Sequence, residues 1–209
     1  MGTSTSYPNG QALISSALTV AQINALLVPL TYGMIGLPVT PPGITSPVRD
    51  VWPTEGQPFQ DAGTDVCYVK CVPHDVDYSR VRDKTLSQSG SGDTTVLTET
   101  WVYTKGWDIA WTLYGPNSED RARMIRSALF MDYFNDQLNL SNLYPVPDAP
   151  EVTRMPEEWN AQWIERADYH IVMYEQVTET ITDGIATSVE VKVFDGSPND
   201  PVADFTVTT

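Results

Sequence analysis

The residue types best suited to chemistry in this sequence are its two cysteines and its two histidines. Cys67 and Cys71 stand four residues apart in the segment CYVKC, and His74 follows them closely. Thiolates and imidazoles bind zinc, but three ligands without a fourth at a known spacing form a weak motif. If the segment is a strand, the two cysteines share one face with their Cα atoms about 13 Å apart, too far for a disulfide. We therefore interpret both as buried structural cysteines and predict no metal site.

Nucleophilic and acid–base signatures are equally weak. Neither histidine, His74 or His170, lies in a nucleophile motif, and no serine lies in a G-x-S-x-G elbow. Glu157 and Glu165 could serve as the carboxylate pair of a glycoside hydrolase. However, such pairs arise by chance among 27 acids, and no spacing selects this one. The sequence predicts no catalytic residue and no cofactor, which leaves surfaces as the functional elements.

A glycine turn in the stretch TLYGPNSEDRARMIR raises the question of a phosphate site. Gly115 and Pro116 separate an alternating apolar strand from a helix, the layout that cradles phosphates in nucleotide-binding proteins. Pro116 lacks an N–H donor, and Glu119 and Asp120 occupy the positive end of the helix dipole, where they repel phosphate. Asn117 is a good N-cap. The sequence therefore predicts a joint between two elements and no anion site.

Three arginines follow this turn within six residues, and they are a quarter of all the Lys and Arg residues: Arg121, Arg123 and Arg126. In one interpretation they form a solvated helix face balanced by nearby acids. In the other they pair with an acidic surface of another copy or of another protein. The sequence leaves both open.

A second cluster lies in the run RMPEEWNAQWIERADYHIVMYEQV, residues 154–177. Trp159 and Trp163 have the i, i+4 spacing that places both on one side of a helical turn. Arg166 and Asp168 share one face if a strand has begun there. Large aromatic side chains beside a guanidinium are favoured at protein interfaces. The alternative is two core tryptophans and a solvent-exposed ion pair.

The charge distribution bounds the possible partners. The formal net charge of −15 makes nonspecific nucleic-acid binding improbable, since duplex affinity comes mostly from cations. A negatively charged surface can still lie beside DNA, because it repels the phosphates and lets the duplex move past without binding. An acidic composition is also explained by solubility alone. From Ser127 to Thr209 there are fifteen acids against three bases, whereas Met1–Val48 holds no charged residue.

The uncharged N-terminal part contains the apolar stretch ALTVAQINALLVPLTYGMIGLPV. No basic residues precede it, and polar residues, a proline and glycines interrupt it, so it falls short of the roughly 20 apolar residues of a membrane span. We interpret residues 17–30 as a soluble helix with an apolar stripe and predict no membrane partner.

Periodicity predicts the remaining elements. Residues 1–16 are expected to be flexible, and the Pro-rich stretch after the first helix is expected to be an extended connector. A strand is predicted at 65–72, then an exposed excursion to about residue 95. Two strands joined by a turn at Lys105–Gly106 are predicted within 96–114, followed by a helix at 118–138.

The last predicted elements are a strand from Ala167 to Val177 and a return strand from Ile185 to Val193. Asp183–Gly184 between them is the dipeptide favoured in two-residue hairpin turns. In the terminal PVADFTVTT, apolar residues alternate with polar ones. Three alternatives stay open for this segment: it adds a strand to a neighbouring subunit, it packs against its own chain, or it is disordered.

The predicted fold class is α+β, with a mainly antiparallel sheet of about five strands, two helices packed on it, and extended N- and C-terminal arms. We divide the chain into an N-terminal arm with the apolar helix and the Pro-rich connector (1–60), an α+β domain (61–195) and a C-terminal tail (196–209).

Several of these features occur together in a known family. The strand ending in aromatic-Gly-Pro before a helix, the NLYPV loop, and the PEEWNAQWIERAD run entering a long strand resemble the phage neck or tail terminator family. The resemblance covers residues 95–182 well and residues 17–75 in outline.

The resemblance implies a structural virion protein in the tail or neck, assembled in the host cytoplasm and without enzymatic activity. It implies a ring, usually of six copies, at the head-proximal end of the tail tube. Such a ring stops tube polymerisation, joins the tail to the neck, and leaves a channel through which DNA passes without sequence-specific binding. The implied partners are further copies of the chain, the tail tube protein, a neck, stopper or portal-side connector, and the sheath where a tail has one.

A closed ring requires a heterologous contact, in which one surface meets a different surface of the next copy. The arginine cluster on one side and the acidic C-terminal half on the other are the candidates, together with Trp159, Trp163, Arg166 and Asp168. The alternative functions are another head–tail connector (a stopper or head-completion protein), a baseplate component, or a carboxylate-based hydrolase.

Overall fold

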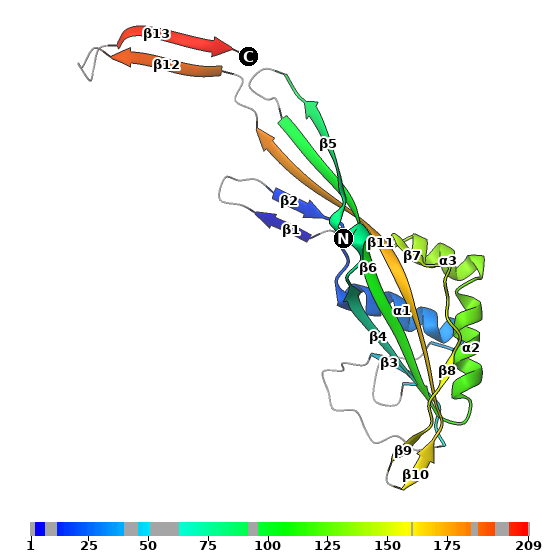
Figure 1. Ribbon diagram of the computed structural model, residues 1–209. Helices are drawn as coiled ribbons and strands as arrows, with labels where there is room; N and C mark the ends of the chain where they lie inside the picture. Colours follow the sequence, from blue (N-terminus) through cyan, green and yellow to red (C-terminus); the bar gives the residue numbers. More distant parts are fainter. Residues whose placement is uncertain are drawn as a thin grey trace. The chain divides into compact units, whose positions relative to one another are not determined.

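The computed structural model describes residues 3–6, 12–39, 46–50, 63–91, 96–159, 161–184, 188–194 and 201–208. These residues form mainly strands, with three α-helices among them (Figure 1). Most strand pairs are antiparallel, so the predicted α+β class with a mainly antiparallel sheet is confirmed. The chain divides into two compact units. Unit 1 contains 1–16, 82–102 and 178–209, and unit 2 contains 17–81 and 103–177.

Two long strands contribute residues to both units, β6 (Val96–Tyr114) and β11 (Arg166–Gly184). The other elements of unit 2 are α1 (Val20–Met34), β3 (Val48–Asp50), β4 (Val66–His74), the 3-10 helix η1 (Asp77–Arg80), α2 (Ser118–Ala128), α3 (Asp132–Asn139), β7 (Leu143–Pro145), β8 (Thr153–Arg154), β9 (Glu157–Trp159) and β10 (Gln162–Ile164). Those of unit 1 are β1 (Thr3–Ser6), β2 (Ala12–Ser15), β5 (Arg82–Ser89), β12 (Ser188–Phe194) and β13 (Pro201–Thr208).

The sheet of unit 2 has the order β11-β6-β4-β3. β4 pairs antiparallel with β6 from Val66↔Tyr114 to His74↔Gly106, and β3 joins β4 in parallel. Strands β7 and β8 both pair with β11. Alternate residues of β4, β6 and β11 form one core with residues of the helices: Cys67, Val69, Cys71, Trp107, Ile109, Trp111, Leu113, Ala167, Tyr169, Ile171 and Met173.

Helix α1 confirms the predicted N-terminal helix, displaced by three to four residues from 17–30. Thr19 and Gln22 form a capping box at its start, which satisfies N–H groups that the first turn leaves free. Ile23 and Leu27 are fully buried. In the part of the chain that the structure describes, no helix combines the length and the apolarity that crossing a membrane requires.

The predicted single helix at 118–138 is two helices, because Met131 adopts an extended backbone between α2 and α3. The break redirects the chain, and Phe134 and Leu138 reach the core. A single amphipathic helix over this range would also place Phe130 and Tyr133 near its apolar face, but both are exposed.

The predicted turn at Lys105–Gly106 is wrong, because β6 runs unbroken past it. Gly106 lies opposite His74, and a Cβ added there would be 2.8 Å from the His74 carbonyl oxygen. This glycine permits close approach of two strands.

Glu175 explains why the alternation of β11 stops at one position. The side chain faces the core and is 1% exposed. Its carboxylate accepts hydrogen bonds from the backbone N–H of Leu18 and from Nε1 of Trp107, at 2.5 and 2.7 Å. The Lys105 ammonium lies 4.0 Å from the centre of the Trp107 ring. A buried charge at this point is therefore hydrogen-bonded and lies close to a cation, and it fixes the segment that leads into α1.

In unit 1, the described residues of the stretch predicted to be flexible (1–16) form strands, since β1 pairs with β2 and β2 pairs with β11. The excursion after residue 74 is exposed as predicted, but it contains η1 and the fully exposed strand β5.

The predicted hairpin through Asp183–Gly184 is wrong, because β12 pairs with β13 in a separate two-stranded sheet. In this register Val189, Val191 and Val193 lie opposite Val207, Phe205 and Ala203, so the apolar positions of both strands match. The terminal residues thus pair within their own chain.

Candidate assembly surfaces

The Gly115–Pro116 turn is a joint, as the sequence predicts, and a carboxylate of the same chain occupies it. Asp65 accepts hydrogen bonds from the Asn117 backbone N–H and side-chain amide, at 3.0 and 2.8 Å, and pairs with Arg121 at 3.0 Å. Gly115 has φ +106°, and a Cβ added to it would lie 2.5 Å from Oδ1 of Asp65. The start of α2 is therefore already neutralised, and no space remains for a phosphate beside the glycine.

The three arginines of α2 are adjacent in sequence but diverge in space, because residues on a helix are separated by about 100°. Arg121 points to Asp65, whereas Arg123 pairs with Glu119 at 2.7 Å and is 67% exposed. Arg126 pairs with Glu151 at 3.0 Å, and its Nε donates to the Pro150 carbonyl oxygen. Each arginine thus has an acid of its own chain, and only Arg123 of the three is largely exposed. Their role at a subunit contact stays a prediction.

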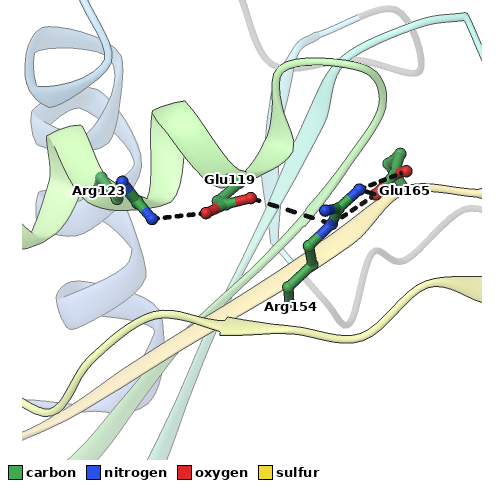
Figure 2. A network of polar contacts seen from close by, with 4 residues as sticks. All are labelled: Glu119, Arg123, Arg154 and Glu165. Atoms are coloured by element: carbon green, nitrogen blue, oxygen red, sulfur yellow. Dashed lines mark hydrogen bonds and ion pairs between the residues drawn. The ribbon is translucent and has the colours of Figure 1, made fainter.

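An alternating row of charges joins α2 to the segment before β11 (Figure 2). Glu119 lies between Arg123 and Arg154, with oxygen–nitrogen distances of 2.7 and 3.9 Å. Arg154 in turn makes a bidentate pair with Glu165, at 2.7 and 3.0 Å. The backbone N–H of Gly115 also donates to the Glu165 carbonyl oxygen. The structure therefore brings together the two regions that the sequence singled out separately.

Arg166 and Asp168 share one face of β11, as predicted. The guanidinium donates to both carboxylate oxygens of Asp168 at 2.8 and 3.0 Å, and to Glu157 at 3.1 Å. These hydrogen bonds raise the pKa of Arg166 further above its usual range. Arg166 also lies 5.7 Å from the ring of Tyr114, whose pKa is raised by partial burial. The pair is thus a fixed, planar group at the end of the sheet.

The predicted helical turn carrying Trp159 and Trp163 is wrong, because the two residues lie on the paired strands β9 and β10. Ala161 between the strands has φ +60°, which allows the chain to reverse there. Trp163 is 71% exposed, so it is not a core residue. Tryptophan is common among the residues that contribute most to binding, and the role of Trp163 at a subunit contact stays a prediction.

The cysteines are buried and free, as predicted. Burial raises the pKa of both thiols, that of Cys71 to about 12, so both stay protonated. Among the described residues no three His, Cys, Asp or Glu side chains are grouped as metal ligands would be. His74 donates to or accepts from Asp108 at 2.8 Å. Glu157 and Glu165 bind different arginines, Arg166 and Arg154, in place of forming a free carboxylate pair.

Sequence reasoning missed Asp65, Glu119 and Glu175 as structural carboxylates. The break in alternation at Glu175 was a usable signal. Asp65 lies 52 residues before its partner Asn117, and no local sequence pattern predicts a contact over that separation.

Residues 21–198 match the family described as phage neck terminator protein. The chain belongs to that family. Among curated proteins, none matches the chain. The predicted family is therefore confirmed, and the chain is a structural bacteriophage protein of the virion tail and neck. A structural role in the tail or neck implies association with other tail or head components.

Proposed function

We propose that the chain forms a closed ring, of six copies, at the head-proximal end of the tail tube. The ring stops tube polymerisation, joins the tail to a neck, stopper or portal-side connector, and leaves a DNA channel. In a contractile tail it would also contact the sheath. The observation that carries this proposal is the family match over residues 21–198, which includes both tryptophans and all three arginines of the predicted contact.

The exposed groups of unit 2 support an assembly role. Trp163 and Arg123 both project into solvent, and the alternating row that ends at Arg123 holds that guanidinium in place. Exposed ion pairs contribute little to folding, typically about 0–1 kcal/mol. A preordered row of this kind is better suited to meeting another subunit, since its side chains lose less entropy on binding.

Assembly in the host cytoplasm fits the two reduced, buried thiols. The division of the chain at residues 60 and 195 stays a proposal.

The function can be tested with purified tail tube protein. Tubes polymerised with the chain should be capped at one end in electron micrographs, and preassembled tubes should sediment with the chain whereas heads should not. Tubes of normal length formed without it would contradict termination. Sedimentation with heads alone would indicate a stopper instead.

A further inference from the structure

One face of the sheet of unit 2 carries none of the described α-helices and is here called the open face; the 3-10 helix η1 touches its edge, where Tyr78 packs against Tyr174 at 6.4 Å. It consists of the residues that alternate with the core residues of β3, β4, β6 and β11. Three cations and two acids lie there, for a formal charge of +1 in a chain of −15: Arg49, Lys70, Arg166, Asp108 and Asp168. Both histidines of the protein, His74 and His170, are on the same face. Glu157 of β9, which accepts hydrogen bonds from Arg166 and Tyr114, offsets one of these cations, so the face is close to neutral in a strongly acidic chain.

The helical segment 118–152, here called the helix face, carries a net negative charge. It holds six acids and three bases, for a formal charge of −3. In the described part of the chain, the carboxylates of Asp132 and Asp136 make no ion pair and no hydrogen bond. Beside them Phe130, Met131 and Tyr133 are each more than half exposed. An apolar patch bordered by free carboxylates suits a partner that is aromatic and cationic.

The open face has these two properties. Arg49, Tyr68, Tyr114 and Arg166 form a row across β3, β4, β6 and β11, in which Tyr68 is buried and the other three residues are half-buried. Arg49 is the register partner of Tyr68, the rings of Tyr68 and Tyr114 lie 6.0 Å apart edge to face, and Arg166 lies 5.7 Å from the Tyr114 ring. Arginine and tyrosine are enriched at interfaces and carry much of their binding energy.

Lys70 adds a cation next to this row. It lies two residues from Tyr68 on β4 and is half-buried. Its ammonium makes no ion pair or hydrogen bond within the residues that the structure describes. Every described arginine, by contrast, has a partner in its own chain, so Lys70 is available to an acid from outside.

We propose that the helix face of one copy packs against the open face of the next copy. This inference rests on the proposed ring. The two faces differ and lie on opposite sides of one sheet, so each copy offers one and receives one, as a heterologous contact requires. Lys70 meets the Asp132 and Asp136 carboxylates, and the exposed Phe130 and Tyr133 cover the half-buried Tyr114.

The test uses two variants that each damage one face. Lys70→Glu places an acid on the open face, and Asp132→Lys with Asp136→Lys places cations on the helix face. Each variant alone should weaken self-association about tenfold or more at physiological ionic strength, where the net charge is screened, measured by sedimentation velocity and native mass spectrometry. Unchanged thermal unfolding would show that each variant still folds.

Mixing the variants gives the decisive result. In an equimolar mixture every contact joins either two native faces or two charge-reversed faces, so alternating rings should form again. Asp83→Lys, at an exposed acid on β5 outside both faces, is the matched control. It should assemble as the native chain does and should not rescue Lys70→Glu.

The outcomes separate this inference from the function. A native chain that stays monomeric would overturn the ring and the inference together. Native rings that neither variant weakens, or defective variants that mixing does not rescue, would overturn the inference alone. If Lys70→Glu formed intact rings but lost DNA retention, the open face would contact DNA in place of another copy. That result would also overturn the inference.

Discussion

Replacing Asp65 with alanine should destabilise the protein by about 3 kcal/mol. The carboxylate holds the start of α2 through Asn117, and losing a helix cap costs about 1 kcal/mol. It also forms a pair with Arg121 in which the two side chains are only 12% and 22% exposed. Losing a charged hydrogen bond of this kind costs about 1.5–3 kcal/mol. The sum corresponds to a lowering of Tm by about 6–12 °C for a chain of this size.

The measurement is urea unfolding followed by circular dichroism, with the Tm determined in parallel. Asp65→Asn should lose about half as much, since its amide oxygen can still accept from Asn117. Glu151→Ala is the matched control, because Glu151 is 82% exposed and its pair with Arg126 should contribute below about 0.5 kcal/mol. In a double-mutant cycle, Asp65→Ala and Arg121→Ala should be less than additive. If Asp65→Ala lowered the free energy of unfolding by less than about 0.5 kcal/mol, Asp65 would not be stabilising the start of α2, and this reasoning would be refuted.

Four other changes test separate parts of the structure. Glu175→Gln should cost about 3 kcal/mol in urea unfolding, since its amide cannot accept from both Trp107 Nε1 and the Leu18 N–H. Gly106→Ala should cost about 1–3 kcal/mol by the same assay, because its Cβ would meet the neighbouring strand at 2.8 Å. Trp163→Ser should leave the Tm unchanged but lower the yield of rings in native mass spectrometry, because its side chain is exposed. A lower Tm would show that Trp163 stabilises the fold instead. Burial raises the pKa of the Cys71 thiol from 9.0 to about 12, so its contribution to stability is complete below pH 9 and declines as pH rises toward 12. Unfolding at pH 8 and pH 10 should show this loss, up to about 1.4 kcal/mol per pH unit, and Cys71→Val should reduce it.

Local periodicity was sufficient for the core of unit 2. The alternation of Trp107, Ile109, Trp111 and Leu113 identified a strand face, and all four residues are buried. Alternation reports which side of an element is apolar, and burial follows that pattern whatever the topology. The joint at Gly115 was equally accessible, because Pro116 and two acids exclude an anion from sequence alone.

The errors arose where a local signal competes with a distant neighbour. Lys105–Gly106 resembles a turn, but the glycine is required by His74, which lies more than thirty residues earlier and is opposite to it in the sheet. Asp183–Gly184 carries a strong hairpin signal, yet β12 takes its partner from the C-terminal residues, where Phe205 and Val207 complete the apolar face. The i, i+4 spacing of the tryptophans fits one side of a helix. It also fits two short paired strands, in which the chain reverses between Trp159 and its partner Gln162, and Trp163 follows next to that pair.

The same distinction applies to the arginines and to assembly. Clustering in sequence indicated a cationic surface, but the charge of Arg121 and Arg126 is largely met by Asp65 and Glu151. Copies of a chain with −15 charges repel one another over long range, and salt screens that repulsion beyond about 8 Å at physiological strength. At contact distance the interaction depends on the charges that meet, and there Lys70 of the open face attracts the Asp132 and Asp136 carboxylates of the helix face. Association between such copies should therefore be strongest at intermediate salt: low enough to keep the contact pairs effective, and high enough to screen the net charge.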